Sequence, residues 1–248
     1  RVAAITEQLC GVSVSSTQVS RVTQKLDDEL SKWRERPLRA HSYVYLDARY
    51  EKIRYEGHVR DLAVLWACGI DLETGRPSVL GVSVSLSEAE VHWRDFLESL
   101  QKRGLTGVQL LVSDDHAGLK AARKKVFSCV PWQRCQFHLA QNAQSYVSCA
   151  SLKKEVGRDL RDVFQSPDEG TAKQRLSQMV LKYAEKSPRL SNKASAFHKL
   201  RYFITSRILH NTCIQNVLML LKAHKEYVPM KFVFFEATQR HGKTWHNG

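Results

Sequence analysis

The sequence has no long hydrophobic run. None of its apolar stretches approaches the ~18–20 residues that a membrane-spanning helix needs, and the first residues lack the pattern of a secretory signal peptide. The six cysteines are spread without the spacing of a disulfide framework, which indicates reduced thiols. We therefore expect a cytoplasmic protein with no membrane partner.

Acidic residues are scarce, above all towards the C-terminus. The chain has 25 Asp+Glu against 38 Lys+Arg, a net charge of +13, and no aspartate follows Asp168. Such a positive field attracts polyanions, so nucleic acid is the first partner to consider. With 43% hydrophobic residues in 248, the chain has enough apolar side chains for a sizeable core, which excludes global disorder.

Composition divides the chain into four regions, namely 1–38, 40–150, 151–190 and 191–248. The first is predicted to form a short helix, a glycine-containing break and a second helix, for which Ser15 and Ser16 are N-cap candidates. The third reads as helical, and the fourth is basic with blurred periodicity. Because the chain starts on arginine rather than methionine, we interpret it as a fragment.

The N-terminal helix pair is open to two interpretations. It resembles a helix-turn-helix whose second helix would present Thr17, Gln18 and Arg21 to DNA. It could equally be a plain helical hairpin that packs on the next domain. The pattern does not separate the two.

Residues 40–150 predict an α/β domain. Three β-like apolar runs, "SYVYLDA", "DLAVLWACGID" and "PSVLGVSVS", precede an amphipathic helix with Ser87 as its expected cap, Val91 on its apolar side and Gly104 as its stop. A buried strand, a basic helix and a short fifth strand follow. This order predicts a mixed sheet whose first three strands are antiparallel and whose later strands add in parallel.

Acidic residues end two of the predicted strands. Asp47 follows one apolar run, and Asp114 and Asp115 follow another. In the predicted sheet Asp47 and Asp114 can meet at one edge, where two carboxylates repel unless a cation lies between them. Hard oxygen ligands suit magnesium or manganese. The alternative is a turn acid and a helix cap, with Asp115 assigned to capping.

The amino-acid sequence closely resembles that of the Mutator-type transposases of bacterial insertion sequences. The segments that carry the resemblance are "LCGVSVSSTQVSRVTQKLDDELSKWRERPL", "VYLDARYEKIR", "GVQLLVSDDHAGLKAA" and "WQRCQFHLAQNA". They contain, in order, an Asp, the motif Asp-x3-Gly-Leu with Gly118, and the motif Cys-x2-His with Cys135 and His138. The resemblance implies a ribonuclease-H-like catalytic domain with an Asp-Asp-Glu triad, in which Asp47 and Asp114 are the first two acids and bind the metal.

Two smaller features of these segments have alternatives. Cys135 and His138 are half of a possible zinc site, but no second pair stands at a convincing distance, so we favour a structural or DNA-positioning role for His138 and Trp132. Arg49 and Arg54 follow the first acid and are candidates for phosphate contacts or for a solvated basic face.

The third acid is the point at which the resemblance fails. Aligning Asn216 with the family's Asn-x-x-Glu-Arg motif puts Met219 in the position of the glutamate. Glu226 is the nearest acid and Glu236 a weaker choice. We find no family pattern after about residue 190, so we predict a truncated or decayed copy that is catalytically weak.

Three functions compete at this point. The resemblance implies a transposase, a homo-oligomer associated with the bacterial nucleoid, that acts on double-stranded DNA at the terminal inverted repeats of its element and at a target. A non-catalytic, sequence-specific DNA-binding protein derived from a transposase is the main alternative. A metal-dependent nuclease on the same fold is the third.

Overall fold

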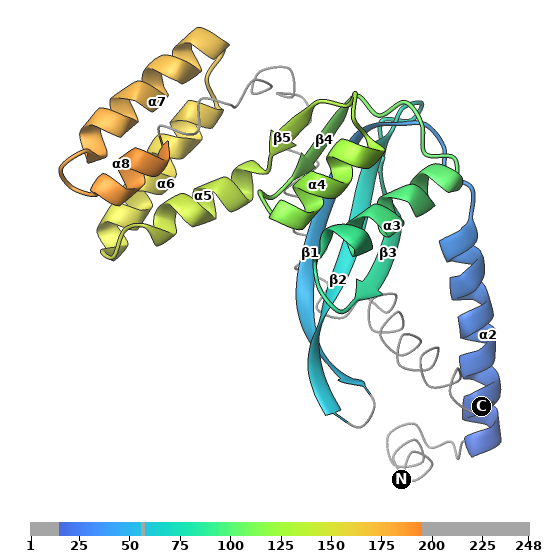
Figure 1. Cartoon of the computed structure of the whole chain (residues 1–248). Helices are drawn as coiled ribbons and strands as arrows, with labels where there is room; N and C mark the ends of the chain where they lie inside the picture. The colour runs from blue at the N-terminus through green and yellow to red at the C-terminus, as the bar shows by residue number, and fades with distance from the viewer. Residues whose placement is uncertain (1–14, 56–57, 195–248) are drawn as a thin grey trace.

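The computed structural model describes residues 15–55 and 58–194. The elements are α2 (Ser16–Glu35), β1 (His41–Tyr55), β2 (His58–Asp71), β3 (Pro77–Ser85), α3 (Glu90–Lys102), β4 (Leu110–Ser113), α4 (Ala117–Val126), β5 (Trp132–Arg134), α5 (Gln136–Ser145), α6 (Ala150–Phe164), α7 (Glu169–Tyr183) and α8 (Pro188–Ala194). Figure 1 shows a sheet with helices beside it and a separate group of helices at one end. No described helix is both long enough and apolar enough to span a membrane.

The sheet has the predicted mixed order. Its strands lie in the order β3-β2-β1-β4-β5, with β1 antiparallel to β2, β2 antiparallel to β3, and both β4 and β5 added in parallel. The antiparallel meander followed by parallel strands confirms the ribonuclease-H-like α/β prediction. This topology places β4 directly beside β1 although about 60 residues separate them in the chain.

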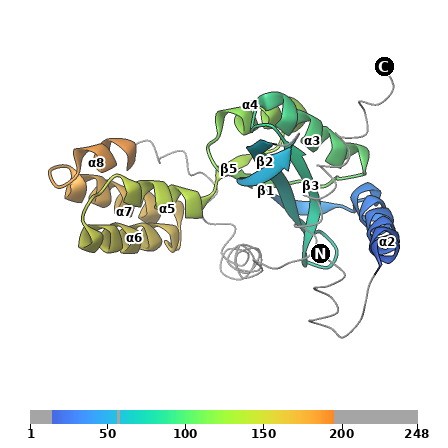
Figure 2. The same cartoon turned by 90° about the horizontal axis from the view of Figure 1, so that it is seen from below.

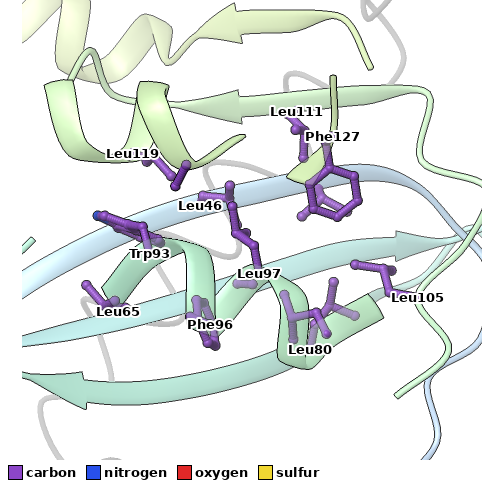
Figure 3. Packing of buried hydrophobic residues seen from close by; sticks show 14 of the residues in the cluster. Leu46, Leu65, Leu80, Trp93, Phe96, Leu97, Leu105, Leu111, Leu119 and Phe127 are labelled. Atoms are coloured by element: carbon purple, nitrogen blue, oxygen red, sulfur yellow. The ribbon is translucent and has the colours of Figure 1, made fainter. Parts of the chain in front are cut away.

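One face of the sheet carries the main hydrophobic core. Helices α3 and α4 cover this face, and Figure 3 shows their side chains pointing at those of the strands. The largest fully buried members come from both layers: Leu65, Leu80, Trp93, Leu97, Leu100, Leu111 and Leu119. The apolar residues of α3 recur at helical spacing and therefore lie on one face of the helix. Burial of this face against the sheet fixes the position of α3.

Helices α5 to α8 form a second packed unit at the end of the sheet, as Figure 2 shows. Its core includes Val156, Leu160, Met179, Tyr183 and Leu190, all at most 3% exposed. Helix α5 follows β5 immediately, so its first turn stays beside the sheet while its later residues pack against α6 and α8. The run of helices therefore begins at Gln136, before the predicted helical region of 151–190.

The start of α2 has the predicted cap. Ser15 is the N-cap, and its side chain and that of Gln18 form a capping box with each other's backbone amides. Val22 on the same helix is 65% exposed. The first helix of the expected helix-turn-helix lies outside the described residues.

Two details of α3 differ from the prediction. Its N-cap is Ala89 rather than Ser87, whose hydroxyl instead accepts a hydrogen bond from the Ala89 amide at 3.3 Å. Val91 is 44% exposed, because the buried face begins with Trp93. The expected stop is confirmed: Gly104 has φ of +97°, a conformation that glycine adopts without strain.

Candidate active site

The pairing of β1 with β4 brings Asp47 next to Asp114. The last paired residues of the two strands are Leu46 and Ser113, and each aspartate is the next residue along its own strand direction. The structure corrects one detail, because Asp47 does not end its strand. β1 continues to Tyr55 as a long hairpin with β2, while β4 stops at Ser113. The carboxylate of Asp47 thus projects from the middle of a rigid strand at the point where its neighbour ends.

The carboxylate of Asp47 lies in a poorly solvated place. Its side chain is 21% exposed, and Oδ1 accepts a hydrogen bond from the Ala48 amide at 2.9 Å. The pKa of the Asp47 carboxyl is raised to about 6, chiefly by burial; His138 and the Ala48 amide oppose the rise, and the charges of Asp114 and Glu88 add to it. A buried negative charge of this kind is stabilised by a bound cation.

His138 connects the Cys-x2-His signature to this carboxylate. Cys135 is the N-cap of α5 and is buried, and its amide donates to the Ser113 carbonyl at 2.5 Å. Three residues later, one turn along the helix, His138 places Nε2 3.9 Å from Asp47 Oδ1. A hydrogen bond with the Cys135 side chain raises the pKa of His138, burial lowers it, and Asp47 and Asp114 raise it further.

Trp132 has a structural place in the same region. Its indole Nε1 donates to Ser113 Oγ at 2.9 Å, and the Arg123 guanidinium lies 4.6 Å above its ring. These contacts join β5, β4 and α4 behind the two aspartates. Cys135 and His138 therefore bind α5 to the carboxylate pair, and Trp132 supports the strand end between them.

The loop after β4 assigns different roles to the two adjacent aspartates. Asp114 Oδ1 accepts from the His116 amide at 3.1 Å, and His116, not Asp115, is the N-cap of α4. The prediction that Asp115 caps the helix is wrong. Its carboxylate instead pairs with Lys120 at 2.7 Å and Arg134 at 3.7 Å, two cations that outcompete a backbone amide for it.

The signature glycine of α4 packs against the loop before α3. A Cβ built on Gly118 would lie 2.2 Å from the Glu88 carbonyl oxygen and 3.0 Å from the Glu90 amide nitrogen, closer than any side chain allows. Glycine is therefore required because backbone meets backbone here. The contact holds the loop that carries Glu88 against the loop that carries Asp114.

Glu88, which the sequence does not single out, lies beside the loop that carries Asp114. Its side chain is 13% exposed, and Oε2 lies 3.8 Å from Nδ1 of His116. Burial raises the pKa of the Glu88 carboxyl, His116 lowers it, and the charge of Asp114 raises it. The sequence does not mark Glu88, because it does not follow an apolar run as Asp47 and Asp114 do. Its neighbour Ser87 is the residue that the pattern predicts as the helix cap.

The predicted DNA contacts fall in separate places. Thr17, Gln18 and Arg21 are exposed at the start of α2, although the side chain of Gln18 is engaged in the capping box. They do not share an element with the carboxylate pair. On β1, Arg49 is two residues beyond Asp47 and thus on the same face of the strand.

Arg49 and Arg54, the two predicted phosphate contacts near Asp47, both lie on β1. Arg49 Nε lies 2.6 Å from Glu51 Oε1, so part of its charge is already paired. Arg54 belongs to β1 and pairs with Val59, but its side chain is not among the described ones. Met219, Glu226 and Glu236 lie outside the described residues.

Asp47 and Asp114 fit a divalent cation by their chemistry. They are hard oxygen donors on neighbouring strands, and the buried Asp47 carboxylate lacks a lysine or arginine partner among the ion pairs of the described residues. Within residues 15–55 and 58–194, no three His, Cys, Asp or Glu side chains are gathered closely enough to chelate one ion. The described residues thus supply two ligands for a cation, not a complete set of ligands.

The order and directions of the strands are those of a ribonuclease-H-like α/β domain. A sequence model of the family described as "Transposase, Mutator family" matches residues 1–225. The chain belongs to this family. The match continues through residue 225, whereas the sequence analysis found the family's pattern only to about residue 190.

Curated proteins similar to this chain are described as transposases for insertion sequence elements. The chain is 49% identical over 193 residues to the transposase for insertion sequence element IS406 of Burkholderia multivorans, covering 77% of this chain and 50% of that one. It is 41% identical over 197 residues to the transposase for insertion sequence element ISRM5 of Rhizobium meliloti, covering 77% and 48%. The chain spans about half the length of these curated relatives.

Among solved structures, the chain matches the Drosophila P element transposase strand transfer complex. The identity is 12% and the TM-score 0.33, with 79% of this chain and 66% of that chain covered. At this score the likeness carries no argument of its own.

Proposed function

We propose that the chain is part of a transposase that cuts and joins DNA strands by metal-dependent phosphoryl transfer. The observation that carries the proposal is the placement of Asp47 and Asp114 side by side by β1 and β4, in a chain of the Mutator family. Asp47 and Asp114 would hold magnesium or manganese. When bound, such an ion stabilises the charge that develops on phosphate oxygens and activates the attacking oxygen.

The described residues around the pair have roles that do not need the ion itself. Asp47 is held by the strand and by the Ala48 amide, and Asp114 by the His116 amide. His138 limits the electrostatic cost of the buried Asp47 charge, since it lowers the pKa of that carboxyl. Together they keep two carboxylates preorganised for one cation, which reduces the reorganisation that binding requires.

The third acid of the triad is proposed to be Glu226, in the segment outside the described residues. Its flanking residues depart from the family's motif, as noted for Met219. Two aspartates alone hold a second ion poorly, because the site then lacks negative charge. Because Glu226 stands outside the family's motif, we propose that it supplies the third carboxylate poorly, so that the chain binds DNA but cleaves it weakly.

The DNA partners follow from the same proposal. The terminal inverted repeats of an insertion sequence would be bound through the basic surface, with Thr17, Arg21 and Arg49 among the contacts, and the target DNA through the same site at the joining step. Because two ends must be joined to one target, a homo-oligomer is proposed. Association with the nucleoid would follow from DNA binding.

The test of the function is an assay of end cleavage and strand transfer with purified chain and manganese. Products joined specifically at the ends of the element support the transposase. Salt-dependent binding without any product would favour the non-catalytic DNA-binding protein. Cleavage that does not depend on the end sequence would indicate a nuclease.

Binding to DNA is expected to weaken by at least about tenfold between 50 and 200 mM salt, because Lys and Arg displace counterions from the phosphates. Fluorescence anisotropy with a labelled duplex measures this. An affinity that does not change over this range would contradict a binding mode based on phosphate contacts.

Arg21→Ala is expected to reduce the preference for element ends over random DNA by roughly tenfold, the effect of one lost base contact. Arg76→Ala is the matched control, since Arg76 is an exposed arginine in the turn between β2 and β3. Competition binding with the two DNAs provides the ratio. An equal loss on both DNAs would make Arg21 a contact to the phosphate backbone.

A further inference from the structure

A third carboxylate, that of Glu88, lies beside the loop that carries Asp114. Glu88 comes from the loop between β3 and α3, far in sequence from both Asp47 and Asp114. Its side chain is 13% exposed and faces His116, whose amide holds Asp114. The mutual influence reaches both aspartates, because Asp114 raises the pKa of the Glu88 carboxyl and Glu88 contributes to the raised pKa of Asp47.

The backbone of Glu88 is fixed between the elements that carry the aspartates. Its amide donates to the hydroxyl of Tyr50, at 3.3 Å, and Tyr50 lies on β1 three residues beyond Asp47. Its carbonyl is packed against Gly118 of α4, where a Cβ would approach within 2.2 Å. The position of Glu88 is therefore set by the framework of the site and not by a solvent-exposed loop.

Two other acids near the site, Glu90 and Asp115, pair with lysine or arginine, whereas the ion pairs of the described residues give Glu88 neither. Glu90 Oε1 lies 2.6 Å from Lys125 Nζ and 3.5 Å from an Arg94 Nη1, and Asp115 is likewise paired with Lys120. The ion-pair partner of Glu88 is a histidine, which is charged only when protonated. The negative charge of Glu88 thus remains available to a cation.

We propose that Glu88 is a further residue of the divalent-cation site, whose negative charge strengthens cation binding by Asp47 and Asp114. The inference rests on the proposed function, since it concerns the same site. Direct chelation is not required: the described residues hold no cluster of three ligands, and magnesium commonly binds through one or two carboxylates while it keeps water molecules. Glu88 acts on the cation through its charge.

The test is a titration of the full chain with Mn²⁺ alone, in which electron paramagnetic resonance reports the free ion. Glu88→Gln, which keeps the size of the side chain, is expected to raise the Kd for Mn²⁺ by about tenfold, the effect of losing an outer-shell partner of a metal ligand. Glu88→Asp restores the charge and is expected to bind within about threefold of the parent. Glu90→Gln is the control and should change the Kd less than about twofold, because Lys125 already neutralises Glu90.

A Kd for Glu88→Gln equal to that of the parent chain would overturn the inference. So would a lowered affinity that Glu88→Asp does not restore, since that result indicates packing rather than charge. Asp47→Asn is titrated alongside. If Asp47→Asn also binds Mn²⁺ as the parent does, the proposed metal site itself fails, and not only the role of Glu88.

Discussion

Replacing Asp47 by asparagine is expected to abolish metal-dependent cleavage of DNA and to leave DNA binding nearly intact, and Asp114→Asn is expected to do the same. Each substitution removes a full negative charge from the cation site but no part of the basic surface. The stabilisation lost is several kcal/mol, which corresponds to a fall in rate of about 10²- to 10³-fold. Because the chain is expected to cleave weakly, the assay uses Mn²⁺ and long incubation.

Asp95→Asn is the matched control for these two substitutions. Asp95 is an exposed aspartate on α3, so its replacement changes the net charge equally without touching the pair. It should retain the parental rate of cleavage. If Asp47→Asn or Asp114→Asn cleaves at that rate as well, the assignment of the site is wrong.

Gly118→Ala is expected to destabilise the chain by about 3 kcal/mol, the upper end of what overpacking costs. Alanine favours helix over glycine by about 1 kcal/mol, but its Cβ would meet the Glu88 carbonyl oxygen at 2.2 Å, so the loop before α3 must move. At roughly 2–4 °C per kcal/mol for a chain of this size, the melting temperature should fall by about 6–12 °C. Thermal unfolding followed by circular dichroism measures this.

Gly157→Ala provides the control for backbone effects alone. In the middle of α6 the added Cβ would meet only the side-chain amide of Gln144, at 3.2 Å, which can rotate away. This variant should be stabilised by about 0.5–1 kcal/mol, because alanine is the better helix former. Equal stability of Gly118→Ala and the parent chain would show that the contact with Glu88 is loose.

The sheet could be predicted because each of its strands is marked by residues that are close together in the sequence. Each strand from β1 to β4 is an apolar run bounded by polar or glycine-containing turns, and the observed order β3-β2-β1-β4-β5 places β4 beside β1. The meeting of Asp47 and Asp114 follows from that order. Their identification as a catalytic pair came from the resemblance to a family, since aspartate after a strand is common in any α/β protein.

The misses concern choices that only packing decides. Acids are frequent before helices, so the sequence predicts Asp115 as a cap, but Lys120 and Arg134, which come from different elements, attract its carboxylate. Strand β1 was expected to end at Asp47, although pairing with β2 extends it to Tyr55. Glu88 reaches the site through the close approach of Gly118, a tertiary contact with no sequence signal.

The most direct test of the central claim is anomalous diffraction from crystals of the chain that contain Mn²⁺. The account predicts a manganese peak shared by the carboxylates of Asp47 and Asp114, with oxygen distances of about 2.1–2.3 Å, near Glu88 but not requiring its direct coordination. Crystals of Asp47→Asn should lose the peak under the same conditions. A peak bound elsewhere, or none between the two aspartates at saturating Mn²⁺, would contradict the account.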